Sequence, residues 1–370
     1  MEKFRRRLGG ILGTLRAEFQ QLYNRYFGGF KQFDGDARQI AQHVLDGLWE
    51  GDFYRTSLGH FDFFWMRDFG TCAESLTKLG YDAKVHSTLK WAIYHYKRVN
   101  EVTLCIDKSG NAFNAPAKRS VDALPWLLHS IVVSDYQLDE SEIKFLERQL
   151  RGYCKGLLDK NGNLRKGVHF AELRDAVNYD RSSYAIALIA RMAECVEILN
   201  LDGFPYKLPH YQEYLKEHYW NGRFLKADFV TNEWSSECGL IAFYLGIIRD
   251  KDMMKKTFDY IDEEKLAEPY PMQYCKHDYK FKFRLGMGKW LMPNYTGTSI
   301  WTWQGSWYLH LLKRYDHPDY EKHYAKFSEL IERHGTYPEM VGPDGEWYRT
   351  LIYNGDPGMV WASIFLELDY

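Results

Sequence analysis

The sequence has few cysteines and no long hydrophobic run, and its charges nearly cancel. Only six of the 370 residues are cysteine, and they are widely spaced without a C-x-x-C pair. This argues against a disulfide-rich secreted domain or a zinc cluster and predicts reduced thiols in a cytoplasmic protein. No apolar run reaches the roughly 18 residues that a membrane-spanning helix needs, so we expect no integral membrane association. The net charge of −2 lacks the basic excess typical of proteins that bind nucleic acid.

The common cofactor motifs are also missing. The chain has no P-loop, no G-x-G-x-x-G after a strand, no H-E-x-x-H, no EF-hand loop and no G-x-S-x-G elbow. We therefore predict neither a metal nor an organic cofactor. Acid–base chemistry by carboxyl groups is the chemistry that remains.

Aromatic residues are abundant by contrast. The chain contains 12 Trp, 28 Tyr and 22 Phe, which together make 17% of the sequence. A hydrophobic core needs fewer Tyr and Trp, because their polar atoms must find partners when they are buried. We therefore expect partly exposed rings that line a cleft.

Helical periodicity runs through the chain after the first 35 residues. It predicts twelve helices, near 37–50, 66–80, 82–99, 120–135, 139–158, 180–199, 207–219, 233–248, 250–263, 297–315, 318–335 and 356–368. Asp139 and Glu142 form a capping-box pattern, and Gly80 suits the residue after a helix end.

The connections between these helices alternate strictly between short and long. Short turns follow the second, fourth, sixth, eighth and tenth helices, and long loops follow the others. Such alternation predicts six antiparallel hairpins with all the long loops on one face. We therefore predict an all-α fold, an (α/α)6 barrel over residues 36–370, with its cleft on the long-loop face. Turn sequences at 108–111, 160–162 and 343–345 predict short hairpins within the loops.

Residues 1–35 predict a separate N-terminal helical extension. Apolar residues from Phe4 to Leu22 recur on one helical face. This face suits packing on the barrel or on a neighbouring subunit, and the second arrangement would make the chain a homo-oligomer.

Carboxyl and aromatic residues gather where the long loops meet the next helices. Trp65, Arg67 and Asp68 end the first long loop, and an Arg–Asp pair beside aromatic rings can bind the vicinal hydroxyls of a sugar. Asp122 lies in the first turn of the next inner helix, with Trp126 one turn further on. A helix cap with a buried ion pair is the structural alternative for these residues.

The third and last long loops offer candidates for acid–base chemistry. Glu172 and Asp175 lie close to Arg174, and crowded carboxyl groups among aromatic walls favour the raised pKa of a general acid. A solvated ion-pair network is the alternative. Glu339 in the last loop follows Tyr337 and Pro338, and Glu346 is the competing carboxylate there.

Five segments, in register with the loops, carry a resemblance to a known family. They are WMRDFG…LTKLGY (65–81), SVDALPWLLHSI (120–131), YWNGRFLKADFV (219–230), MPNYTGTSIWTWQGSWYLHLL (292–312) and YPEMVGPDGEW…VWASIFL (337–366). In this order the chain resembles the six-hairpin (α/α)6 glycosidases. Members include glucoamylase, alkaline/neutral invertase, the glucosidase part of glycogen debranching enzyme and mannosylglycerate hydrolase.

The resemblance implies roles for individual residues. Glu339 corresponds to the base that activates water, and Asp175 to the general acid, although the glucoamylase-like pattern favours Glu172 as the acid. The residues implied for sugar binding are Arg67, Asp68 and Asp122, with the rings of Trp65, Trp126, Trp301, Trp303 and Tyr337. We expect Glu339 to stay ionised through its hydrogen bonds and the acid to be the more desolvated group.

The sequence thus predicts a glycoside hydrolase, inverting, that acts on a small α-glycoside such as an α-glucoside or a sucrose-like or trehalose-like sugar. Inversion needs a protonated carboxyl on the leaving oxygen and a carboxylate that activates water on the opposite face. Two alternatives remain: a sugar epimerase or isomerase on the same toroid, and a carbohydrate-binding relative without catalysis.

Overall fold

The computed structural model describes residues 19, 23, 26, 29–115, 119–168, 170, 172–174, 177–277 and 291–369. The predicted N-terminal helix lies almost entirely outside these residues, so the division at residue 35 stays a prediction. The described part is mostly helical, with each of the twelve predicted helices present and a few very short strands. The all-α class is therefore confirmed in outline.

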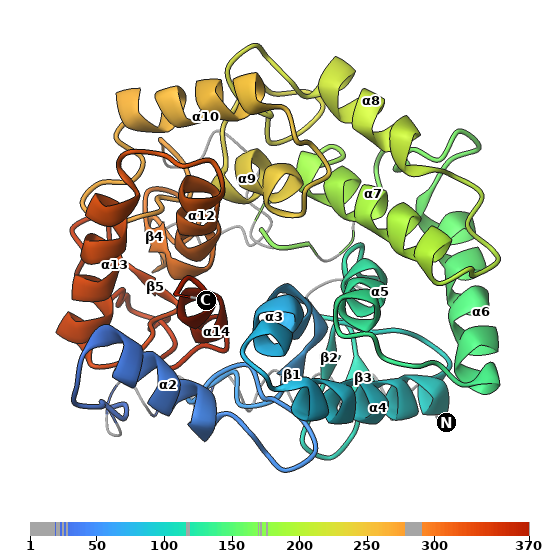
Figure 1. Cartoon of the computed structure of the whole chain (residues 1–370), viewed down its shortest axis with the longest axis horizontal. Coiled ribbons are helices and arrows are strands. Elements are labelled where there is room, and N and C mark those ends of the chain that lie inside the picture. Colours follow the sequence, from blue (N-terminus) through green and yellow to red (C-terminus); the bar gives the residue numbers. More distant parts are fainter. Residues whose placement is uncertain are drawn as a thin grey trace.

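The helices form two concentric layers (Figure 1). The inner helices are α3 (Met66–Lys78), α5 (Ala123–Val133), α7 (Ser183–Ile198), α9 (Ser236–Tyr244), α12 (Thr302–Arg314) and α14 (Ala362–Glu367). The outer helices are α2 (Ala37–Gly47), α4 (Asp82–Val99), α6 (Glu140–Leu157), α8 (Leu208–His218), α10 (Lys251–Glu263) and α13 (Tyr320–His334). Each inner helix contacts the next in this order, and α14 contacts α3. This arrangement is compatible with the predicted toroid.

Local sequence explains where several helices begin and end. Asp36 and Asp139 cap α2 and α6 in capping boxes with Gln39 and Glu142. Gly80 follows α3 with φ +82°, a backbone conformation that glycine adopts without strain. The inner helices α5, α7 and α9 are apolar on nearly every side, because they pack against both neighbours and the outer layer.

Close packing of the inner layer depends on one glycine in particular. A Cβ atom at Gly70 of α3 would lie 2.5 Å from the Cβ atom of Trp126 in α5. Any larger residue at this position would push the two helices apart, so glycine sets their spacing.

The predicted loop pattern is confirmed. Short turns such as 79–81, 134–139 and 315–319 lead from inner to outer helices, and long loops such as 48–65, 100–122 and 335–361 lead from outer to inner ones. The three predicted hairpins form. β2 (Cys105–Ile106) pairs with β3 (Ala112–Phe113), and Leu158 and Val341 form bridges with Leu164 and Trp347.

Two small antiparallel sheets join loops that are distant in the chain. β1 (Phe64–Trp65) pairs with β2, and β4 (Ile300–Trp301) pairs with β5 (Met340–Val341). Five inner helices begin later than the sequence predicts: α5 at residue 123, α7 at 183, α9 at 236, α12 at 302 and α14 at 362. α12 begins late because the residues just before it, Ile300 and Trp301, form β4 and pair with β5. The sequence analysis assigned them to the helix because they continue its apolar pattern.

The first and last long loops are joined by a buried carboxylate, which we call the Asp356 clamp. The carboxylate of Asp356 accepts hydrogen bonds from the backbone N–H groups of His60 (2.7 Å) and Phe61 (3.0 Å) and from the hydroxyl of Ser57. It also pairs with Nδ1 of His60 at 2.8 Å. Gly59 lets the loop approach this closely, because a Cβ atom there would overlap the Asp356 carboxylate.

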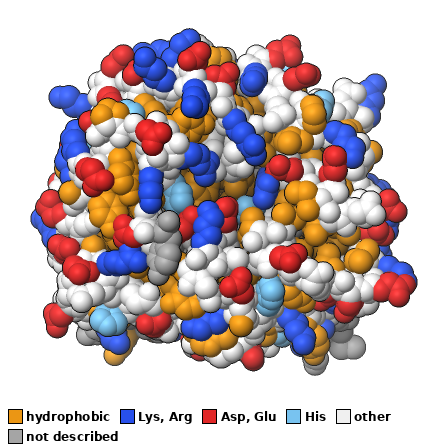
Figure 2. Space-filling model, viewed as in Figure 1, with side chains coloured by type: hydrophobic (Ala, Val, Ile, Leu, Met, Phe, Trp, Pro, Cys, Tyr) orange, Lys and Arg blue, Asp and Glu red, His pale blue; other side chains and the backbone are white. Residues whose placement is uncertain are grey.

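The described surface is of mixed charge. Lys and Arg side chains are interspersed with Asp and Glu over the face seen in Figure 2, in keeping with the near-zero net charge. All six cysteines are free thiols. Among the helices that the structure describes, none has both the length and the hydrophobicity needed to cross a bilayer.

Replacing Asp356 by Asn should destabilise the fold by about 3 kcal/mol, because buried donors would lose their charged acceptor. Burial would raise the pKa of Asp356, but the charge of His60 and the hydrogen bonds from His60, Ser57 and Phe61 outweigh burial and hold the pKa below its usual range. This stabilisation is therefore present at neutral pH and is lost as the pH falls into the acidic range. Urea denaturation at pH 7 and pH 4 measures both effects.

Asp369→Asn is the matched control, since Asp369 pairs with Arg38 at the surface and should contribute less than about 1 kcal/mol. Equal losses in the two variants would contradict a special role for the clamp.

Candidate active site

Glu339 is held in the sixth long loop by a dense set of donors. The hydroxyl of Tyr353 donates to its carboxylate and lies 2.9 Å from each of the two oxygens. The backbone N–H of Asp356 also donates to the carboxylate, at 2.9 Å. Its own backbone N–H donates to the Asp356 carbonyl at 2.8 Å. The residue is only 3% exposed. The orientation of this carboxyl group is therefore fixed by Tyr353 and by the backbone of Asp356.

Burial changes the acidity of Glu339 more than its hydrogen bonds do. Burial raises the pKa of Glu339 to about 8, although the charge of His60 and the bonds from Asp356 and Tyr353 act in the opposite direction. The direction of this shift runs against the expectation that hydrogen bonds keep Glu339 ionised. Desolvation of a carboxylate outweighs the donors that hold it.

Arg67 is paired with Asp122 rather than with the adjacent Asp68. Its Nε lies 2.5 Å from the carboxylate of Asp122, which also accepts the hydroxyls of Ser120 (2.5 Å) and Tyr184 (3.1 Å). Both members of the ion pair are buried. Nη2 of Arg67 is buried without a partner among the described residues, so a donor remains for a ligand.

Asp68 contacts the closing segment of the chain. It accepts the indole N–H of Trp361 at 3.2 Å, and the Trp361 ring stacks on Trp303 with 4.5 Å between centroids. Burial raises the pKa of Asp68 to about 7, against the charge of Arg67 and the bond from Trp361. Arg67, Asp68 and Asp122 thus lie at the starts of α3 and α5, and their role in sugar binding stays a prediction.

Of the two candidate acids in the third long loop, one is described. Glu172 is buried and accepts the hydroxyl of Ser182, which caps α7. Asp175 and His169 lie outside the described residues, and the predicted separation of the two catalytic carboxyls stays a prediction.

Glu237 is a candidate that the sequence analysis missed. It lies in the first turn of α9 and is fully buried. The Tyr179 hydroxyl donates to Oε1 at 2.8 Å and accepts Nη1 of Arg174 at 3.0 Å, while Oε2 has no partner in the described part of the chain. Burial raises the pKa of Glu237, against the charge of Arg174 and the bond from Tyr179. The sequence could have indicated Glu237, because it stands in the first turn of an inner helix just as Asp68 does in α3.

The predicted aromatic residues fall into two groups. Trp65 is half-buried against Phe61, whereas Trp301 and Trp303, at the start of α12, are only 7% and 2% exposed. Trp126 and Tyr337 are fully buried: Trp126 donates to Tyr184 at 3.2 Å, and the Tyr337 hydroxyl bonds with Ser306. We therefore assign these two residues to the packing of the inner helices.

Several of the buried hydrogen-bonding groups without a partner in the described residues lie where long loops meet inner helices. Buried atoms without a partner in the described residues include Nη2 of Arg67, Oε2 of Glu237 and the indole nitrogens of Trp65 and Trp303. A buried donor or acceptor left unpaired costs about 1–3 kcal/mol. A ligand rich in hydroxyl groups can supply partners of both kinds.

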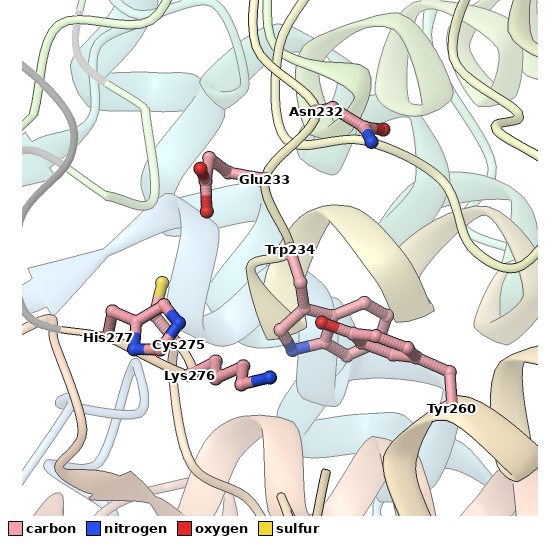
Figure 3. Close-up of a pocket in the computed structure, with 7 residues that line it drawn as sticks. All are labelled: Asn232, Glu233, Trp234, Tyr260, Cys275, Lys276 and His277. Atoms are coloured by element: carbon pink, nitrogen blue, oxygen red, sulfur yellow. The ribbon is translucent and has the colours of Figure 1, made fainter. Parts of the chain in front are cut away.

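A cavity opens on the same loop side next to α9, with a volume of about 340 Å³ (Figure 3). It is lined by Asn232, Glu233, Trp234, Tyr260, Cys275, Lys276 and His277. A separate group on the outer helices, Asp262, Asp319 and His323, has ligand atoms within 4.8 Å of one another and could hold a metal ion. Asp262 lies in α10, Asp319 directly precedes α13 and His323 lies in α13.

Tyr353→Phe should raise the pKa of Glu339 further, because it removes a donor to the ionised carboxylate. A ¹³C NMR titration of the glutamate carboxyl groups, with Glu339 assigned through Glu339→Gln, measures the shift. Tyr348→Phe is the control, since the Tyr348 hydroxyl donates at 2.6 Å to the carbonyl of Pro293 instead. An unchanged or lowered pKa in Tyr353→Phe would contradict this account.

Comparison with known proteins bears on the fold. A scan against protein-family models and a search of curated protein sequences both find no match. The chain is similar to the solved GH63 mannosylglycerate hydrolase from Thermus thermophilus in complex with Tris, with a TM-score of 0.55 and 13% identity over 90% of this chain and 99% of that one. It is also similar to a glycosidase variant in complex with glucose, with a TM-score of 0.64 and 13% identity over 90% and 95% of the two chains. The chain therefore shares its fold with solved glycoside hydrolases, as the resemblance predicts.

Proposed function

We propose that the protein is an inverting glycoside hydrolase built on an (α/α)6 toroid, and that it acts on a small α-glycoside. The observation that carries this proposal is Glu339, a carboxyl group held by Tyr353 and the Asp356 backbone on the long-loop face. The unpaired polar atoms near the starts of α3, α9 and α12 support a ligand with many hydroxyl groups.

In the proposed mechanism Glu339 in its ionised form removes a proton from water, and the water attacks the anomeric carbon. The general acid, Asp175 or Glu172, protonates the oxygen of the leaving group. Arg67 and Asp68 bind hydroxyls of the sugar ring that receives the water. Arg67 is oriented for this role by the ion pair with Asp122.

A glycoside of a hydroxy acid is the second substrate candidate. One similar structure is the mannosylglycerate hydrolase in complex with Tris and D-glycerate, with a TM-score of 0.57 and 12% identity over 90% of this chain and 99% of that one. A panel of glycosides should therefore include such compounds, with the anomer of the product read by NMR. Incorporation of solvent deuterium at a sugar carbon would support the epimerase alternative instead.

Glu339→Gln should lower turnover by about 10²-fold or more, because the amide keeps the shape but cannot accept the proton of water. Sugar binding, measured by calorimetry, should survive. The pKa of about 8 predicts that kcat/KM of the wild type rises with pH up to that value, since only the ionised form is a base. Glu346→Gln is the control, because Glu346 pairs with Arg333 at the surface. Near-normal hydrolysis by Glu339→Gln would move the base elsewhere.

The general acid can be identified from the dependence on the leaving group. The variant that lacks the acid should lose about 10²-fold or more in disaccharide hydrolysis but keep the hydrolysis of a glycosyl fluoride, because fluoride departs without a proton. We expect this pattern for Asp175→Asn, and for Glu172→Gln if Glu172 is the acid. Asp180→Asn is the control, since Asp180 pairs with Arg181. A uniform loss on both substrates in each variant would contradict both assignments.

A further inference from the structure

Three side chains of the kinds that bind metal ions meet between α10 and α13, which are neighbours in the outer layer (Figure 1). Asp262 lies in the last turn of α10, Asp319 directly precedes α13, and His323 lies one turn further on. Their carboxylate oxygens and imidazole nitrogen lie within 4.8 Å of one another. Sequence motifs could not reveal this group, because α10 and α13 are distant in the chain and only the fold brings them together.

His323 is the deeply buried member of the group. It is only 1% exposed, and neither ring nitrogen bonds to any residue that the structure describes. Its ring packs edge-on against Tyr308 of α12, with 5.3 Å between the centroids. Burial, together with the charges of Lys322 and Lys326, lowers the pKa of His323 to about 4. The ring is therefore neutral at neutral pH, and the neutral imidazole is the form that binds a metal ion.

The two carboxylates of the group are available to a cation. Asp319 stands at the N-cap of α13, where an Asp usually accepts a backbone N–H. Its side chain accepts none from the first turn, which the structure describes in full, and it forms a long ion pair with Lys322 at 3.7 Å. Burial raises the pKa of Asp262, and the charge of Asp319 adds to this while that of His317 opposes it. A divalent cation between the two carboxylates would remove their repulsion.

A second unused polar group lies beside these ligands. The hydroxyl of Tyr308 is buried and has no partner among the described residues. Burial raises the pKa of Tyr308, and the charges of Asp262 and Asp319 raise it further, so the hydroxyl lies near both carboxylates. Such a hydroxyl can donate to a metal-bound water or to a ligating carboxylate, which is how outer-shell groups support metal sites.

We propose that Asp262, Asp319 and His323 bind one divalent transition-metal ion, with zinc as the best match, and that this ion ties α10 to α13. Zinc takes His and Asp ligands at about 2.0–2.2 Å, whereas calcium and magnesium prefer sites built from oxygen atoms alone. Two ligand atoms of one zinc ion lie at most about 4.4 Å apart. A rotation of the exposed Asp262 side chain is enough to bring the group within that limit. This proposal does not rest on the proposed function.

The experiment titrates zinc chloride into the EDTA-treated protein by calorimetry and follows Tm. We expect one ion per chain, and a rise in Tm of about 3 °C at free zinc 100-fold above Kd. Asp262→Asn, Asp319→Asn and His323→Phe should each weaken binding by about 10-fold or more, since even the loss of an outer-shell partner has this effect. The two Asn variants replace groups near the surface, so they test the site even where His323→Phe does not fold.

Matched controls separate this site from zinc bound elsewhere on the surface. Asp252→Asn at the other end of α10 and His210→Phe on α8 should change neither the affinity nor the rise in Tm. Lys322→Met should tighten zinc binding by about 3-fold, because it removes a cation that competes for Asp319. The absence of saturable binding, zinc binding that the three ligand variants do not weaken, or equal affinity for calcium and zinc would each overturn the proposal.

Discussion

The carboxylate of Asp356 is the interaction on which the candidate site depends. It is fully buried and is satisfied by Ser57, His60 and Phe61 of the first long loop, although it belongs to the last one. The same residue donates its backbone N–H to Glu339. One amino acid therefore holds the two ends of the loop series together and orients the proposed base. A shift of this residue would disturb the joint between the loops and the base at the same time.

The buried carboxyl groups differ in acidity because their surroundings differ. Asp356 has several donors and a histidine partner, and its pKa is held below the usual range. Glu339, Asp68 and Glu237 have fewer compensating partners, and burial raises their pKa. Environments that separate the pKa values of neighbouring carboxyl groups are typical of sites for acid–base chemistry. The three carboxyl groups with a raised pKa also lie near the starts of inner helices: Asp68 in α3, Glu237 in α9, and Glu339, whose carbonyl accepts the backbone N–H of Thr302 in α12.

The sequence predicts the helices well because their apolar periodicity is local, and it predicts the loop alternation for the same reason. It fails where a partner is distant in the chain. Arg67 pairs with Asp122, 55 residues away, although Asp68 is adjacent. Tyr353 becomes a partner of Glu339 only because the loop folds back on itself. The sequence suggests that donors surround Glu339, and the expectation of an ionised carboxylate is based on them. It does not show how many protein atoms exclude water from this group, and it is this burial that raises its pKa.

The closure of the inner layer has a consequence for how the protein forms during translation. α14 packs against α3 and α2, which are made some three hundred residues earlier, and every residue of α14 is buried. Until α14 has left the ribosome, α3 lacks one neighbour and exposes apolar surface. At a synthesis rate of roughly 5–20 residues per second, this gap lasts for many seconds. During this time the apolar side of α3 that α14 later covers stays open to water.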